Sequence, residues 1–309
     1  MTEKLSKLLE RIVQKDQLAL SKAISFIENE PELVFEIEEE YKNFLMERNL
    51  KSLENFKSYI VGFTGSPGAG KSTLTDAYIS RLRAAGKSVG IVAVDPSSPF
   101  TGGAILGDRI RMKRHFTDDS VFIRSMGSRG NVGGLNDSIF GVIMLYTLFG
   151  FDYILIETVG AGQSEIDIVY VADTVVLVLH PGGGDEIQLM KAGIMEIADI
   201  FAINKSDLDG AELLKINLET TLSFSGTNKP IVMCVATSGK GVDELYQAIE
   251  KHKVEIFSSG ELLYRAERRK RKHAESIINK RIQKVLSNNL IDGKNVSEIV
   301  NFVLRNLCK

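Results

Sequence analysis

A glycine-rich segment that ends in a lysine and a serine is the part of the sequence best suited to chemistry. It is Gly65-Ser66-Pro67-Gly68-Ala69-Gly70-Lys71-Ser72, which fits the phosphate-binding pattern G-x-x-x-x-G-K-[ST]. In such a loop the backbone N–H groups surround the β-phosphate, the lysine reaches the β and γ oxygens, and the hydroxyl binds Mg²⁺. We therefore predict that this segment, together with Thr73, binds a nucleoside triphosphate, with Lys71 and Ser72 in those two roles.

A short polar segment further along the chain could select the base. Asn204-Lys205-Ser206-Asp207 fits N-K-x-D, the pattern of guanine-binding proteins. The Asp207 carboxylate can accept hydrogen bonds from both N1–H and the N2 amino group of guanine, whereas adenine offers no such pair of donors on that edge. The pattern therefore favours GTP over ATP. A second base-contacting loop is expected at Val235-Ala236-Thr237, where Val235 stands in place of the serine of an S-A-K-like loop.

Acidic residues at the ends of two predicted strands could hold a metal ion. Glu157-Thr158-Val159-Gly160 lies where GTPases usually carry D-x-x-G, and Asp95 follows another apolar run. Because the carboxyl ends of neighbouring parallel strands share one edge of a sheet, both carboxylates can face one Mg²⁺. We expect Glu157 and Asp95 in the metal shell and the Gly160 N–H on the γ-phosphate. The alternative is that Asp95, which precedes Pro-Ser-Ser, only stabilises a turn.

Short apolar runs of strand length must position these residues. They are 59–63, 89–94, 121–123, 153–156, 174–179, 200–203 and 231–235. Most of the stretches between them are long enough for a helix, so the sequence predicts an α/β fold with a mostly parallel sheet covered by helices on both faces. In such a fold ligands bind at the carboxyl ends of the strands, where the segments above lie.

Both ends of the chain have the period of amphipathic helices. Apolar residues at helical spacing fill the first 55 or so residues and return after Val242. They predict a charged helix from Glu261 to Ser287 and a last amphipathic helix that carries Val296 and Leu304. We therefore divide the chain into an N-terminal helical extension (1–55), a nucleotide-binding domain (56–257) and a C-terminal helical arm (258–309).

The charged helix carries a dense basic cluster. Its members are Arg265, Arg268, Arg269, Lys270, Arg271 and Lys272. Because the formal net charge of the chain is −2 and no aromatic residues are interleaved, we expect a solvated helix face or a contact between two arms rather than a patch for nucleic acid or an acidic membrane.

The composition excludes several other classes of protein. Hydrophobic residues make up 44% and charged residues 25% of the 309 residues, as in a folded globular chain. Two cysteines and four dispersed histidines argue against a disulfide framework or a zinc site. The longest apolar run, Ile139 to Phe149, is too short to span a bilayer, so we expect no membrane insertion. The first residues lack the pattern of a signal peptide, so the expected location is the cytoplasm.

Several segments in this order resemble the MeaB/ArgK family of P-loop GTPases. They are Gly65–Thr73, Ala93–Ser98, Gly107–Met112, Glu157–Glu165 and Asn204–Asp207. The resemblance covers nearly the whole chain, including residues 17–24 and the C-terminal helices. Members of this family are chaperones of the adenosylcobalamin-dependent enzyme methylmalonyl-CoA mutase, and older names describe them as transport ATPases for lysine, arginine and ornithine.

The resemblance implies a chaperone that binds and hydrolyses GTP and dimerises through its C-terminal arm. It would gate cofactor loading and protection of methylmalonyl-CoA mutase or a related cobalamin-dependent acyl-CoA mutase, with GTP/GDP and Mg²⁺ as its cofactors. By position, Asp95 and Asp108 belong to the first switch and the metal shell, and Glu157 and Gln163 to the second switch. Residues 182–191, which end at Lys191, form a third switch that responds to the partner.

The residue that orients the attacking water is open at this level. In small GTPases the catalytic glutamine directly follows the glycine of D-x-x-G, but Gln163 lies three residues beyond Gly160. Asp95 or Asp108 could take this role instead, and Lys191 or a partner could supply positive charge. We therefore expect slow intrinsic hydrolysis that a partner accelerates.

We consider three alternative functions. A P-loop kinase or ATPase linked to amino-acid transport would need an acceptor site, and no such site is recognisable in the sequence. A metal-delivery GTPase would need clusters of cysteine or histidine. A GTPase that targets nascent chains to membranes would need a methionine-rich groove, and the 8 methionines are not gathered in the terminal helices.

Overall fold

A seven-stranded parallel sheet forms the centre of the molecule. The computed structural model describes residues 2–29, 37–39, 58–95, 109–127, 138–158, 164–182, 194–287 and 295–307. The strands are β1 (Tyr59–Thr64), β2 (Val89–Asp95), β3 (Val121–Gly127), β4 (Tyr153–Glu157), β5 (Thr174–Leu179), β6 (Ile200–Ile203) and β7 (Ile231–Met233). Their order is β3-β2-β4-β1-β5-β6-β7, and every neighbouring pair is parallel. The predicted α/β class is confirmed.

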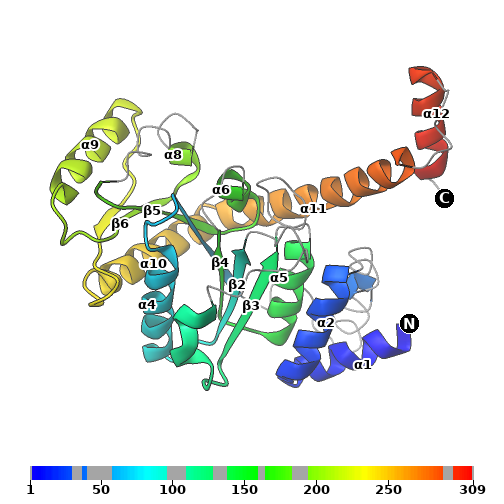
Figure 1. The fold of residues 1–309 in the computed structure, drawn as a ribbon, viewed down its shortest axis with the longest axis horizontal. Coiled ribbons are helices and arrows are strands. Elements are labelled where there is room, and N and C mark those ends of the chain that lie inside the picture. Colours follow the sequence, from blue (N-terminus) through cyan, green and yellow to red (C-terminus); the bar gives the residue numbers. More distant parts are fainter. Residues whose placement is uncertain are drawn as a thin grey trace.

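Helices cover both faces of this sheet (Figure 1). One face packs against α4 (Lys71–Ala84), the 3₁₀ helix η3 (Arg109–His115) and α10 (Val242–Ser258). The other packs against α1 (Thr2–Val13), α2 (Gln17–Asn29), α5 (Ser138–Phe149) and the 3₁₀ helix η4 (Ile168–Tyr170). Alternate residues of a strand point to opposite faces. Ile60 of β1 therefore packs on the side of α5, while Val61 and Phe63 pack on the side of α4.

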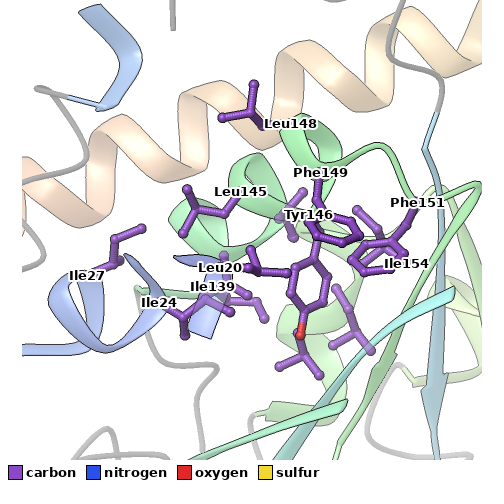
Figure 2. Packing of buried hydrophobic residues seen from close by; sticks show 14 of the residues in the cluster. Leu20, Ile24, Ile27, Ile139, Leu145, Tyr146, Leu148, Phe149, Phe151 and Ile154 are labelled. Carbon is purple, nitrogen blue, oxygen red and sulfur yellow. The ribbon is translucent and has the colours of Figure 1, made fainter. Parts of the chain in front are cut away.

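The N-terminal helices share a hydrophobic core with α5 and the sheet. Figure 2 shows α2 and α5 contributing Leu20, Ile24 and Tyr146 to one cluster, in which Ile154 of β4 also takes part. The Tyr146 hydroxyl donates to the carbonyl of Ile91 at 3.0 Å, so the one polar atom of this large buried side chain is satisfied. This layer fixes α5 against β4 and thereby supports the strand that ends at Glu157.

Three further helices lie around the β5–β6 end of the sheet. They are α6 (Ser164–Asp167), α8 (Ile194–Ile197) and α9 (Ala211–Phe224). A third apolar cluster joins them to the sheet, with Leu177 and Phe201 packed against Leu214 and Leu218 of α9. This packing holds the strand ends from which residues 180–182 and 204–210 emerge.

The last two helices form an extended arm. The long helix α11 (Glu261–Leu286) runs past the sheet, and α12 (Val296–Leu307) lies at its far end (Figure 1). The predicted charged helix is therefore confirmed almost to the residue. The basic cluster differs from the expectation, because Arg265, Arg268 and Arg269 bind the chain's own nucleotide-binding domain rather than solvent.

Two strands differ by more than one residue from their sequence-based bounds. The run 121–123 stops at Arg124, but β3 continues to Gly127 because Arg124 forms an ion pair with Glu28 of α2. The run 231–235 is longer than β7, because the backbone turns after Cys234 and the N–H of Val235 donates to the carbonyl of Lys240 at 2.9 Å. Among the described helices, none is both long and apolar enough to cross a bilayer.

Candidate nucleotide-binding site

The glycine-rich loop connects β1 to α4 at the carboxyl edge of the sheet. Lys71 and Ser72 open α4 and are both buried, whereas Pro67 and Gly68 at the tip of the loop are exposed. The Lys71 ammonium donates to the carbonyls of Gly65 at 2.6 Å and Ser66 at 3.0 Å. The positive charge is therefore held inside the curve of the loop and next to the N-terminus of α4, an arrangement suited to phosphate. Thr73 follows in the first turn of the same helix.

Asn204 joins three of the predicted segments. Its side-chain amide donates to the carbonyl of Ala69 at 2.8 Å, and its carbonyl oxygen accepts from the N–H of Ala236 at 3.1 Å. Gly70 has φ +85°, and a Cβ there would collide with the Asn204 amide. The N-K-x-D segment, the phosphate loop and the 235–237 loop are thus locked together through one buried side chain.

Replacing Asn204 with alanine tests this three-way contact. We expect Asn204→Ala to lower the free energy of unfolding by about 1–3 kcal/mol, because two buried backbone groups lose their partner. Urea denaturation without nucleotide measures the loss. Asn217→Ala, on the exposed face of α9, is the matched control and should change stability by less than about 0.5 kcal/mol. Equal changes in the free energy of unfolding for the two variants would contradict the three-way contact.

Two of the expected metal ligands lie in direct contact. The Ser72 hydroxyl donates to Glu157 Oε1 at 2.5 Å, and both side chains are buried. Next to them, the Thr158 hydroxyl donates to that of Thr64 at 3.1 Å, which ties the end of β4 to the end of β1. A hydroxyl and a carboxylate are hard oxygen donors of the kind that Mg²⁺ prefers, so the residues present fit this ion.

The other predicted catalytic and metal residues cannot be placed in the same way. Asp108, Gly160, Gln163 and Lys191 lie outside the described residues, and Asp95 is described only as the last backbone position of β2. Within the part of the chain that the structure describes, no three His, Cys, Asp or Glu side chains come together as a metal cluster. The described donors at the predicted metal position are therefore Ser72 and Glu157.

The predicted base-binding residues lie on loops beside the phosphate loop. The N–H of Asn204 donates to the carbonyl of Leu179 at 2.8 Å, and that of Ser206 to Cys234 at 3.0 Å, so the segment follows β6 between two strand ends. Lys205 has φ +55°, a left-handed conformation that only a fixed local structure imposes on a lysine. Asp207 is exposed, as is Thr237 in the loop after β7, so both can reach a ligand from solvent.

Two lysines act on the histidine that follows β5 at this edge. Burial and the nearby charges of Lys205 and Lys71 lower the pKa of His180, which directly follows β5. The histidine therefore favours its neutral form beside the two lysines in the absence of an anion. A bound phosphate chain would compensate these positive charges.

One contact near the site was not predicted by any sequence motif. Asp76 of α4 binds the end of η3 through Arg114 at 2.5 Å and His115 at 3.1 Å. Burial tends to raise the pKa of Asp76, but the hydrogen bonds from His115 and Arg114 bring it below its ordinary value. This ion pair ties the chain just after Asp108 to the helix that begins with Lys71. Its one sequence signal is that Asp76 lies four residues after Ser72, on the same face of the helix.

The parallel sheet, the loop between β1 and α4 and the buried lysine at its end define a P-loop nucleotide-binding protein. The whole chain is similar in fold to a crystal structure of an LAO/AO transport system kinase, with a TM-score of 0.63 and 22% identity over 99% of this chain and 98% of that one.

Sequence comparison narrows this class. The model of the family "Methylmalonyl Co-A mutase-associated GTPase MeaB" matches residues 20–291, and the chain belongs to this family of P-loop GTPases. A relative from Pyrococcus horikoshii that is named a GTPase is 43% identical over 96% of this chain and 92% of its own length. The GTPase ArgK of Escherichia coli is 37% identical over 65% of this chain and 63% of its own, and the mouse "Methylmalonic aciduria type A homolog, mitochondrial" is 34% identical over 81% and 63%.

Proposed function

We propose that this GTPase gates cofactor loading and protection of a cobalamin-dependent acyl-CoA mutase, with methylmalonyl-CoA mutase as the first candidate. The observation that carries the proposal is the match of residues 20–291 to a family described as mutase-associated. The name of the mouse relative, which refers to methylmalonic aciduria, supports the same candidate mutase.

In this proposal each part of the site has a defined task. Lys71 and the backbone of the loop hold the β- and γ-phosphates, and Asp207 recognises guanine. Ser72 and Glu157, with Asp95 and Asp108, would hold Mg²⁺, which supplies positive charge to the phosphates when bound. Their contact in the structure supports the first two assignments. Gln163 and Lys191 keep their proposed roles in the second and third switches.

We further propose that the protein works as a homodimer joined through its C-terminal arm. Three apolar side chains of α12, Val296, Val300 and Leu304, are exposed and four residues apart, so they form one face of the helix. A second arm is the partner that this face fits. The proposed task of dimerisation is to present two GTPase sites to the mutase.

The function is tested by measuring GTP hydrolysis with and without purified methylmalonyl-CoA mutase from the same source. We expect at least about a tenfold higher turnover number at saturating mutase, because a partner that orders the switches completes the site. The same comparison with ATP should show little hydrolysis. Equal rates with and without mutase would contradict the gating role, and transfer of phosphate to the mutase would indicate a kinase instead.

A further inference from the structure

The long helix α11 is attached to the domain in an unusual way. All 26 of its residues are described, and none of them is buried. Besides the packing of Leu262 on the core and the stacking of His273 on Phe140, polar contacts fasten its first half. Arg265 donates to both carboxylate oxygens of Asp199, at 2.7 and 2.9 Å, and to the carbonyl of Asp173 at 2.7 Å. Burial alone would raise the pKa of Asp199, but the hydrogen bonds from His252 and Arg265 hold it well below its usual range, so this anchor stays charged.

One turn further along, α11 holds the short helix η4 and the residues after it. Arg268 donates to the carbonyl of Val169, and Arg269 donates to that of Val171 at 2.7 Å and pairs with Asp173. The ring of Tyr170 lies 5.9 Å from the Arg268 guanidinium carbon and 4.8 Å from the Lys272 ammonium nitrogen. Side chains of α11 thus contact most of the segment 169–173.

The other side of η4 packs directly on the strand that leads into the phosphate loop. Ile168 is fully buried and lies over Gly62 of β1, where a Cβ would collide with the Ile168 side chain. Gly62 is three residues before Gly65, the first residue of the loop. A single turn of 3₁₀ helix is therefore held between β1 and the arginines of α11.

The segment held in this way follows the proposed second switch, which contains Glu157 and Gln163. Helix α6 begins at Ser164, directly after Gln163, and continues into η4. The upstream end of the same switch is fixed at Glu157 and Thr158 by the contacts with Ser72 and Thr64. The described residues before and after 159–163 are therefore both held, Glu157 and Thr158 by Ser72 and Thr64, and 168–173 by β1 and α11.

We propose that Arg268 and Arg269 are positioning residues for GTP hydrolysis, because they fix the segment that follows the second switch against the phosphate-loop strand. A displacement of the arm, by a second arm or by the mutase, then changes the rate of hydrolysis through η4. This inference rests on the proposed function, since it assigns a means of regulation to the same GTPase site. By linkage, the state of the nucleotide also biases the position of the arm.

The chain offers a matched pair of variants to test the inference. Arg268→Ala/Arg269→Ala removes the grip on η4, and Lys270→Ala/Arg271→Ala removes the same charge from the exposed side of the same helix. Turnover number, KM for GTP and GDP affinity are measured for both without mutase. The first variant should have an at least fivefold lower turnover number, with KM and GDP affinity within about twofold of the parent, and Arg268→Lys/Arg269→Lys should recover part of the rate. The control should match the parent. Equal turnover numbers for the first variant and the control would overturn the proposal.

Amide hydrogen exchange separates this inference from the proposed function. Residues 164–173 should exchange at least about fivefold faster in Arg268→Ala/Arg269→Ala than in the control, and unchanged exchange would overturn the inference even if the parent protein hydrolyses no GTP. Absence of hydrolysis in the parent, with or without mutase, would instead overturn the proposed function. If the double variant does not fold, Arg268→Gln and Tyr170→Leu replace it. Each should lower the turnover number at least twofold, and parent-like rates in both would reject the positioning role.

Discussion

Lys71→Ala should abolish the GTPase activity and lower the affinity for GTP by about 100-fold or more. The lysine is the buried positive charge of the phosphate loop, and its ammonium already lies within 3.0 Å of two loop carbonyls. Removing a donor aimed at developing phosphate charge typically costs a factor of about 10²–10³ in rate. Thermal unfolding with and without GDP gives the direct readout, since a ligand at 100 times its Kd stabilises the fold by about 2.7 kcal/mol. That stabilisation should disappear in the variant.

The matched control is Lys251→Ala on α10. Lys251 is 77% exposed and lies on the same side of the sheet as α4, so its loss removes one positive charge without touching the site. The unfolding temperature without nucleotide should stay close to that of the parent for Lys251→Ala. Because Lys71→Ala also removes the donor to the carbonyls of Gly65 and Ser66, its stabilisation by GDP is measured against its own nucleotide-free form. GTP hydrolysis by Lys71→Ala within about threefold of the parent rate would remove the phosphate-loop assignment.

The sheet could be predicted because its five inner strands are buried on both faces. Each such strand is a short apolar run bounded by polar turn residues, and all seven runs appear as strands. The order β3-β2-β4-β1-β5-β6-β7 has no local signal in the sequence, because it depends on which helix covers which face. The predicted end of β3 was wrong because it also depends on a contact between distant segments. The partner that neutralises Arg124 lies on helix α2.

Segments that each carry a complete chemical pattern could be recognised from the sequence. The phosphate loop follows β1 and the N-K-x-D segment follows β6, at the same edge of the sheet with β5 between them, and Ser72 meets Glu157. The contacts between segments were not predictable. The sequence gives no sign that Asn204 would bridge to Ala69 and Ala236, because only the assembly of the sheet brings these three residues together.

The basic cluster of α11 shows the limit of charge patterns most clearly. Six consecutive or near-consecutive cationic residues favour a solvated face when only the net charge is known. The periodicity of the helix divides them, so that Arg265, Arg268 and Arg269 face the domain and Lys270 and Arg271 face solvent. Backbone carbonyls of Val169, Val171 and Asp173 are among the acceptors that make this division, and carbonyls carry no sequence signal.

Asp207→Asn should weaken GTP binding by about 100-fold and create affinity for xanthosine triphosphate. A carboxylate accepts from both N1–H and the N2 amino group of guanine, whereas an asparagine presents one acceptor and one donor, and the donor faces the amino group. Losing one charge-assisted bond and opposing two donors disfavours guanine strongly. Xanthine has a carbonyl in place of that amino group, so the asparagine donor gains a partner. Competition of GTP, XTP and ATP against a fluorescent GDP analogue measures all three affinities.

Asp209→Asn provides the control within the same loop. Both aspartates are exposed and lie only two residues apart, so the two variants change the same charge in nearly the same place. If the loop acted only through its charge, both variants would have the same nucleotide affinities, because each removes one negative charge that repels the anionic nucleotide. Recognition of the base by Asp207 requires opposite behaviour: Asp209→Asn keeps the preference for GTP, and Asp207→Asn reverses it toward XTP. If the parent protein bound ATP and GTP equally, the N-K-x-D segment would have no role in choosing the base.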